Sequence, residues 1–282
     1  MSIADQITRL SNAKANIKQA IENKGVEVSD SALLDEYPAL IDSIEVGSGG
    51  GGSADPFYEI MWNMATNNGT DYSYLFHNYN GTSLDVSGLD TSNVTNMYCM
   101  FQNCNKLTSL DVSNFNTSNV TEMRYMFHDC NNLTELDVSN WDTSNVKNMG
   151  YMFAGNVSPN KLTVKGLNNW DISKVTNITD MFAKNWTITE LDLSFWDISK
   201  VTTISGAFNN CTKLVDFKAP KNIGANMSVS SSTALSHDSL MSIINNLATV
   251  TSSKTLTLGS TNLAKLTDEE KAIATNKGWI LK

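Results

Sequence analysis

Basic side chains and long apolar runs are scarce in this sequence. Lys and Arg together number 20 against 29 Asp and Glu, which gives a formal net charge of −9. The basic residues form no stripe, so nucleic-acid binding is disfavoured, because phosphate contacts supply much of that affinity. An acidic chain is equally poorly suited to an anionic membrane surface. No stretch of 18 apolar residues occurs, so we expect no transmembrane helix and no membrane insertion.

The N-terminus, MSIADQITRL, lacks a basic segment followed by an apolar one, which is the pattern of a signal peptide. We therefore expect a chain that is made in the cytosol and leaves it only by lysis or as part of a particle.

Residue groupings typical of catalytic centres are missing as well. The three histidines (His77, His128 and His237) fall in no Ser–His–Asp order and in no zinc-ligand spacing, and no paired-acid constellation stands out. We predict that the protein is not an enzyme and uses no cofactor.

Cysteines are few, and their spacing is not that of a C-x-x-C metal or redox pair. Three of the four (Cys104, Cys130 and Cys211) share one repeat position. This predicts a packing column of buried free thiols, and a disulfide between Cys104 and Cys130 is the alternative.

What the sequence does contain is a set of near-identical segments of about 26 residues between Tyr74 and Pro220. An apolar residue followed by Phe recurs at Phe76, Phe101, Phe127, Phe153, Phe182 and Phe208. A Leu-x-Val/Leu triplet keeps the same register and begins at Leu84, Leu110, Leu136, Leu162 and Leu191. A third marker is Leu89, Phe115, Trp141, Trp170 and Trp196, and a fourth is Val94, Val120, Val146, Val175 and Val201. A period in the twenties predicts a stacked solenoid.

Each repeat divides into two halves. Alternating buried positions from Leu107 to Phe115 predict a short strand, and Asn116–Asn119 predict a turn. The spacing of Val120, Met123 and Met126 predicts a short helix on the other face. The expected fold is therefore α/β, a leucine-rich-repeat-like solenoid with one strand and one short helical piece per repeat.

Four regions follow from these patterns. The pattern of residues 1–46 predicts two amphipathic helices that anchor or oligomerise the protein. Residues 47–54 are a Gly/Ser linker. Residues 55–220 are the solenoid, and 221–282 are a C-terminal α/β cap. Within the cap we expect a helix at His237–Leu247, a strand at Lys254–Leu258, a capping box at Thr267–Glu270 that opens a helix to about Asn276, and a final strand at Trp279–Leu281.

The repeats resemble the BspA-like leucine-rich repeats of bacterial surface proteins. The resemblance rests on the segment LDVSNFNTSNVTEMRYMFHDC from Leu110 to Cys130 and on LDVSNWDTSNV from Leu136 to Val146, and it covers about residues 74–220. It implies surface adhesion without catalysis.

The N-terminal segment resembles that of phage tail and minor structural proteins. The segment ITRLSNAKANIKQAIENKG from Ile7 to Gly25, with LDEYP at Leu34–Pro38 and IDSI at Ile41–Ile44, carries this similarity. It implies a virion-attachment module that contacts other virion proteins through residues 1–46. Together with the predicted helices, it favours a homo-oligomer, with a trimer preferred.

An acidic column is the first candidate binding feature of the repeats. The middle residue of the Leu-x-Val triplet points away from the core and is Asp in four copies: Asp85, Asp111, Asp137 and Asp192. Carboxylates on strands about 4.8 Å apart repel, and Ca²⁺ would relieve this, but the dense ligand set of a calcium site is missing. We predict no metal site and an acidic, solvated ligand-binding face.

Polar turn residues and aromatic residues form further columns. Asp90, Asn116, Asp142, Asp171 and Asp197 either bond to their own backbone or form a hydrogen-bonding surface for glycans. Tyr74, Tyr125 and Tyr151 either recognise a ligand or pack half-buried. Trp141, Trp170 and Trp196 are interpreted as core, with sugar stacking as the alternative.

We expect ligand specificity to reside at the positions that depart from the repeat. They are the three-residue insertion between Val164 and Trp170 and the change to Ile-Ser-Lys at Ile172–Lys174 and Ile198–Lys200. Lys174 and Lys200 are therefore candidate ligand contacts, with Tyr125, Tyr151 and the acidic column.

These features predict a phage tail or capsid fibre, localised to the virion, whose repeats bind a glycan or protein of the host cell surface. The alternative is a bacterial cell-surface adhesin of the BspA-like repeat family.

Overall fold

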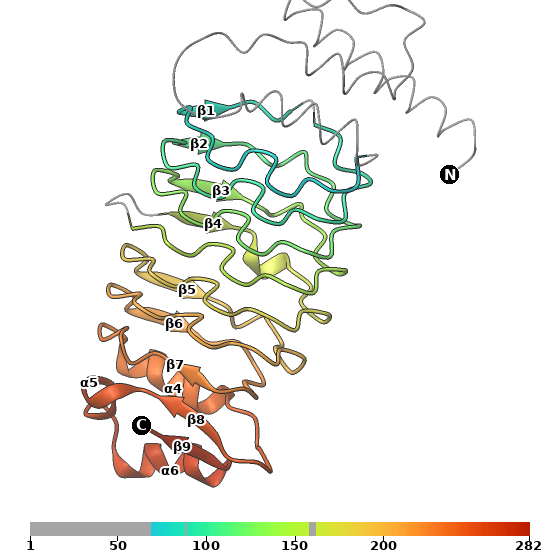
Figure 1. Ribbon diagram of the computed structural model, residues 1–282. Coiled ribbons are helices and arrows are strands. Elements are labelled where there is room, and N and C mark those ends of the chain that lie inside the picture. The colour runs from blue at the N-terminus through green and yellow to red at the C-terminus, as the bar shows by residue number, and fades with distance from the viewer. Residues whose placement is uncertain (1–68, 88, 158–161) are drawn as a thin grey trace, which may run out of the picture. The chain divides into compact units, whose positions relative to one another are not determined.

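The computed structural model describes residues 69–87, 89–157 and 162–282 (Figure 1). The chain divides into two compact units, Met1–Asp71 and Tyr72–Lys282, and the second unit is described below. The predicted N-terminal helices and the Gly/Ser linker lie outside the described residues. The predicted boundary between residues 220 and 221 stays a prediction.

The second unit is a mixed α/β structure of short strands in small parallel sheets, with few helices. Its elements in chain order are β1 Ser83–Leu84, β2 Ser109–Leu110, β3 Glu135–Asp137, β4 Thr163–Lys165, the 3₁₀ helix η1 Leu167–Asn169, β5 Glu190–Asp192, β6 Asp216–Lys218, β7 Met227–Ser228, α4 His237–Asn246, β8 Lys254–Thr257, α5 Gly259–Leu263, α6 Asp268–Asn276 and β9 Trp279–Leu281. The sheets among the described residues are open, and none closes into a barrel.

Strands β1 to β6 follow one another along one side of this unit (Figure 1). They pair in parallel as β1–β2, β3–β4 and β5–β6, with Leu84 opposite Leu110 and Leu136 opposite Val164. The marker leucines of neighbouring repeats therefore meet in register. The pairing is interrupted between β2 and β3 and between β4 and β5.

A second ladder of parallel bridges joins the other half of each repeat. It runs through Asn96, Glu122, Asn148, Asn177 and Thr203. Here the prediction of a short helix is wrong, because this half is a series of turns. The backbone N–H of Met123 donates to the carbonyl of Asn148 in the next repeat, and Tyr125 donates to Gly150. A helix needs those N–H groups for bonds four residues back, so it cannot form alongside the ladder.

The period-three spacing of Met123 and Met126 has a different origin from a helix. The N–H of Met126 bonds to the Met123 carbonyl over 3.2 Å, and His128 bonds to Tyr125 over 3.1 Å. Overlapping turns of this kind place every third side chain on one side, as a helix does.

Two aromatic spines fill the interior. Phe76, Phe101, Phe127, Phe153, Phe182 and Phe208 stack with centroids 5.2 to 6.1 Å apart. Phe115, Trp141, Trp170 and Trp196 stack beside them at 6.0 to 6.4 Å. Each indole N–H donates to a backbone carbonyl of the preceding repeat, for example Trp196 to Leu167 over 2.8 Å. The tryptophans are buried, which confirms their interpretation as core.

The cysteine column is buried and free of disulfides, as predicted. Cys104, Cys130 and Cys211 each donate a hydrogen bond to a phenylalanine carbonyl of the preceding repeat. Asn185 occupies the same position and bonds to the Phe153 carbonyl over 2.8 Å. The shared role is donation to a buried carbonyl, which would otherwise be left unpaired.

The C-terminal elements agree closely with the sequence prediction. Helix α4 ends at Asn246, β8 ends at Thr257, and the capping box of Thr267 and Glu270 opens α6. Strands β7, β8 and β9 form a parallel sheet. Serines of α4 bind the backbone of β6 and of the residue after it, because Phe217 N–H donates to Ser239 Oγ and Ala219 N–H donates to Ser242 Oγ.

Candidate functional site

Four tyrosines from successive repeats come together on the surface. Ring centroids are 5.2 Å apart for Tyr74 and Tyr98, 5.9 Å for Tyr98 and Tyr125, and 4.5 Å for Tyr125 and Tyr151. The first two pairs meet edge to face, and the third is stacked. We call these four residues, with Arg124, the tyrosine strip.

The backbone of the strip is unusual for its residue types. Tyr74, Tyr125 and Tyr151 have φ of 61, 60 and 59°, in the left-handed region, while Gly206 occupies the same position in a later repeat. A bulky residue in this region costs about 1–2 kcal/mol relative to glycine. The side chains, and not the backbone, therefore account for tyrosine at these positions.

Arg124 lies across the strip. Its guanidinium carbon is 4.8 Å from the ring centroid of Tyr125 and 5.6 Å from that of Tyr151. Arg124 Nη2 donates to the Tyr125 hydroxyl over 3.4 Å. Cation–π contact with the flat guanidinium thus fixes one positive charge against the pair of rings.

Two histidines border the strip. The His77 ring packs edge-on against Tyr74 at 5.5 Å, and the His128 ring packs against Tyr125 at 5.2 Å. His128 Nδ1 lies 3.1 Å from Asp129 Oδ2. Each histidine follows its tyrosine by three residues, and its ring packs edge-on against the tyrosine ring.

The hydroxyls of Tyr98 and Tyr151 have raised pKa values and remain protonated at neutral pH. A hydrogen bond to Asp180 raises the pKa of Tyr151 to about 12, and a hydrogen bond with Tyr74 raises the pKa of Tyr98 further. Tyr74 is 45% exposed and the other three are partly exposed. Because the Tyr125 and Tyr151 rings stack on each other, the pair offers its hydroxyl edges to a ligand more than its ring faces.

Polar side chains of the bridge ladder hold the strip in place. Asn148 Nδ2 donates to Glu122 Oε2 over 2.9 Å, and Asn177 Nδ2 donates to Asn148 Oδ1 over 3.0 Å. Glu122 Oε1 accepts the backbone N–H of Arg124 over 2.7 Å. The segment that carries Arg124 and Tyr125 is therefore fixed from both neighbouring repeats.

The predicted acidic column is exposed but serves its own turns. Oδ1 of each aspartate accepts the N–H two residues later, at Ser87, Ser113, Ser139 and Ser194. Hydrogen bonds from these serines lower the pKa of Asp85, Asp111 and Asp137. Within the described residues, no group of three His, Cys, Asp or Glu side chains is arranged to hold a metal ion.

The second polar ladder behaves in the same way. Asp90, Asn116, Asp142, Asp171 and Asp197 each accept the N–H two residues later through Oδ1. This is the self-bonding interpretation of the turn residues, in which the side chain replaces a missing backbone partner.

The two candidate lysines belong to another part of the surface. Lys174 Nζ donates to Asn145 Oδ1 over 2.7 Å, and Lys200 is exposed. Among the described residues, neither makes a cation–π contact with the strip. The structure thus brings together Tyr125 and Tyr151 but leaves the aspartates and lysines elsewhere in the repeat.

Sequence reasoning missed two members of the strip, Tyr98 and Arg124. Tyr98 stands one residue before the column position, which is Cys99 in its repeat, so register alone excluded it. A signal for Arg124 was present, since it is the single arginine within the repeats.

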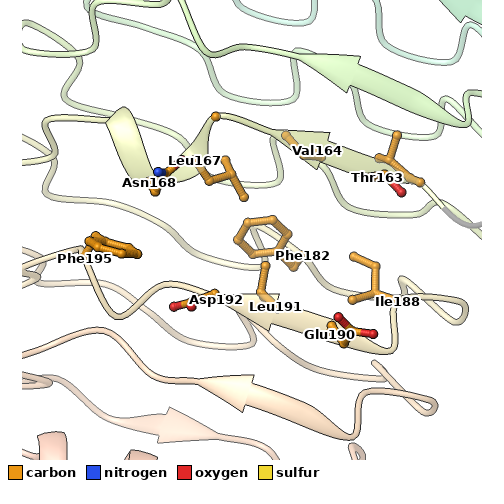
Figure 2. A pocket seen from close by; sticks show the side chains of 12 residues that line it. Thr163, Val164, Leu167, Asn168, Phe182, Ile188, Glu190, Leu191, Asp192 and Phe195 are labelled. Carbon is orange, nitrogen blue, oxygen red and sulfur yellow. The ribbon is translucent and has the colours of Figure 1, made fainter.

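A cleft of about 420 Å³ marks the three-residue insertion. It lies where β4 and β5 fail to pair, and the insertion forms η1 beside it. Figure 2 shows Asp192 and Phe195 at one end and Thr163 and Glu190 at the other. Phe195 is 64% exposed, and Phe182 lines the cleft from the buried spine. The predicted specificity of this departure stays a prediction.

The chain matches a protein family over most of the repeats. The family is described as "Mycoplasma protein of unknown function, DUF285", and it matches residues 70–163 and 158–234. Because these ranges cover more than half of the sequence, the chain belongs to this family, which is associated with BspA-like surface proteins in general. The comparisons with curated proteins and with solved structures gave no match. Within the part of the chain that the structure describes, no helix has the length and apolar character of a membrane span.

Proposed function

We propose that the stacked repeats form a leucine-rich-repeat-like solenoid that works as a binding surface for a bacterial host cell. In this proposal the chain is a virion structural protein, a tail or capsid fibre, anchored through residues 1–46 as a homo-oligomer. The resemblance of the N-terminal segment to phage tail proteins supports the anchor, and display in several copies would raise a weak single-site affinity by avidity.

The tyrosine strip is the observation that carries the binding function. Four exposed or partly exposed tyrosines span four repeats, and three of them occupy strained left-handed backbone. Strain that persists in the native state supports a role for the side chain that causes it. Tyrosine is also a frequent anchor of recognition surfaces, because it has large area and few rotatable bonds.

Replacement of Tyr151 by Gly separates recognition from folding. Gly relieves the left-handed backbone at φ 59° while it removes a ring that contacts Tyr125. We expect Tyr151→Gly to keep its thermal transition within a few degrees, since ΔΔG of about 1 kcal/mol shifts Tm only slightly in a chain of this size. We also expect it to lose most binding of labelled full-length protein to candidate host cells.

The matched control is Trp186→Ala, which removes a 46% exposed aromatic ring outside the strip. Equal binding by wild type, Tyr151→Gly and Trp186→Ala would remove the strip from the proposal. Failure of the wild-type protein to bind any candidate host would contradict host recognition itself.

A bacterial cell-surface adhesin is the second candidate function. The association of the family with BspA-like surface proteins favours it. Immunogold labelling distinguishes the two, because a fibre labels purified virions and an adhesin labels bacterial cells in the absence of phage.

A further inference from the structure

Arg124 holds a charge that the surrounding protein does not neutralise. The chain has two arginines, Arg9 and Arg124, in a sequence of net charge −9. Among the described residues, no carboxylate lies within ion-pair distance of Arg124. A guanidinium on an acidic protein ordinarily finds such a partner, so its absence within the described repeats requires a reason.

Most of the hydrogen-bonding capacity of Arg124 is also unused. A guanidinium carries five N–H donors. Its hydrogen bond to a described residue is the long one of 3.4 Å to the Tyr125 hydroxyl. Nε is buried and has no partner in the described structure. A buried donor without a partner destabilises the protein, and a charged one does so more strongly.

Two acids near Arg124, Glu122 and Asp180, accept hydrogen bonds from other donors. Glu122 accepts from the Arg124 backbone N–H and from Asn148. Asp180 accepts from the Tyr151 hydroxyl, which raises the pKa of that tyrosine. Asp129 lies beside His128. None of these three acids lies within ion-pair distance of the guanidinium.

The position and orientation of the Arg124 guanidinium are fixed before a ligand binds. The guanidinium lies over two tyrosine rings, at 4.8 and 5.6 Å, and these rings stand in a stack with a centroid distance of 4.5 Å. Its flat fork of donors matches two oxygens of one phosphate or carboxylate group, a geometry that lysine lacks. The Tyr125 hydroxyl accepts the hydrogen bond from Arg124 Nη2 and keeps its own O–H as a donor for the anion.

We infer that Arg124, with the hydroxyl of Tyr125, forms a binding site for an anionic group, a phosphate or a carboxylate, borne by the ligand. This inference rests on the proposed binding function of the strip and names the chemistry of its ligand. Phosphodiester-linked and uronic-acid-containing surface polymers both carry such a group, and a neutral glycan does not.

The scarcity of arginine makes a direct test available. In full-length protein labelled with ¹⁵N-arginine, the Nε–H region of an NMR spectrum contains two signals, and Arg124→Lys identifies the one that belongs to Arg124. Titration with diglycerol phosphate, galacturonate and galactose then compares a phosphodiester, a carboxylate and a neutral sugar. We expect a saturable shift of the Arg124 signal with one or both anions and none with galactose.

The relative response to the two anions assigns the source. A tighter response to diglycerol phosphate indicates a phosphodiester polymer, and a tighter response to galacturonate indicates an acidic sugar. Shifts of the Arg9 and Arg124 signals of equal size, or no shift with either anion, would overturn the inference.

Variants at the same position test the geometry of the site. Arg124→Gln should weaken binding of the better anion at least about tenfold, as expected for loss of charge-assisted hydrogen bonds. Arg124→Lys keeps the charge and loses the fork, so its affinity should fall between wild type and Arg124→Gln. These affinities are measured by calorimetry, and the Tm of each variant reports its folding.

The cell-binding and anion-binding experiments test the proposed function and the anionic site separately. Cells that bind wild type and Arg124→Gln equally would refute the anionic site and leave the proposed host recognition standing. A saturable Arg124 shift in a protein that binds no host cell would support the site and contradict the proposed function.

Discussion

The repeats and the C-terminal segment use opposite solutions to the same backbone problem. Left-handed backbone recurs in the repeats on non-glycine residues, among them Tyr125, Asp129 and Lys184. From Ile223 onward, the described positions with positive φ are glycines, Gly259 and Gly278. The C-terminal segment thus follows local conformational preference, whereas the repeats, which also have glycines at Gly155, Gly166 and Gly206, override it at many further positions.

The hydrogen bonds explain why the repeats tolerate this strain. Their backbone N–H groups bond to the next repeat, as Phe127 does to Met152 over 2.9 Å. C-terminal elements instead satisfy much of their backbone locally, through α4, α6 and the capping box of Thr267. Each repeat is therefore held by its neighbours, and strain in one layer is offset by contacts with two others.

The largest effect should come from breaking the stack at its centre. Phe127 is buried and packs against Phe101, Trp141 and Phe153. We expect Phe127→Ala to lower the free energy of unfolding by about 3–5 kcal/mol, because it opens a cavity between two repeats. Urea unfolding gives this value, and hydrogen exchange should show faster opening in the repeats on both sides than in α6.

The control is Phe195→Ala, which removes a ring that is 64% exposed and should change stability by less than about 0.5 kcal/mol. A loss of protection confined to the repeat of Phe127 would show that the layers are more independent than their shared hydrogen bonds imply.

A pair of glycine exchanges gives an intermediate effect and sharpens the comparison directly. Lys184 is exposed with φ 59°, so Lys184→Gly should raise stability by about 0.5–1 kcal/mol, as relief of the left-handed strain exceeds the added chain entropy. Gly278 has φ 89°, and a Cβ there would lie 2.5 Å from the Val250 carbonyl oxygen. Gly278→Ala should therefore lower stability by more than about 1 kcal/mol.

Thermal unfolding of the two variants measures both signs. A loss of stability in Lys184→Gly would mean that the lysine side chain, and not the backbone, determines stability at that position. It would contradict the contrast in backbone strain between the repeats and the C-terminal segment.

The smallest effect is a pH dependence confined to the C-terminal segment. His237 Nε2 lies 2.8 Å from Glu270 Oε1 and joins α4 to α6. This bond raises the pKa of His237 above its usual 6.5, so its contribution is complete below that pH and is lost as pH rises through the folded-state pKa. Hydrogen bonds from Thr267 and His237 lower the pKa of Glu270 below 4.5, so its contribution is lost in acid.

Between pH 4.5 and 6.5 both contributions are present. The Tm of wild type should therefore exceed that of His237→Gln by more at about pH 5.5 than at about pH 8, by a small amount since the pair is exposed. A difference that is constant with pH would exclude the ion pair as its cause.

Prediction from sequence succeeded where signals are local. The capping box of Thr267 and Glu270, the strand at Trp279–Leu281 and the stop at Gly278 act within a few residues, and the structure has each of them. The marker residues of neighbouring repeats also meet in register, as Leu84 does with Leu110 and Phe101 with Phe127. The helix expected around Met123 failed, because three-residue spacing describes a run of turns as well as a helix.

The repeat register predicted only some residues of the candidate site. Tyr125 and Tyr151 share a repeat position, so the sequence named both as candidates. Cys99 holds that position in the preceding repeat, and the ring of its neighbour Tyr98 contacts Tyr125 instead. The aspartates of the outer column matched the pattern of a ligand face, yet each one accepts a hydrogen bond from its own turn. Whether a polar side chain forms a hydrogen bond with its own backbone depends on the local φ and ψ, which composition does not give.

The amino-acid sequence by itself determined the repeat, its period, the two aromatic spines and the C-terminal elements, because hydrophobic columns and short-range caps are written in residue order. The tertiary structure decided which side chains remain available. Tyr98 and Arg124 join the strip, and the exposed aspartates accept hydrogen bonds from their own turns. Arg124 has no ion pair with a carboxylate of the described residues, because contacts with the neighbouring repeats set the partners of each side chain.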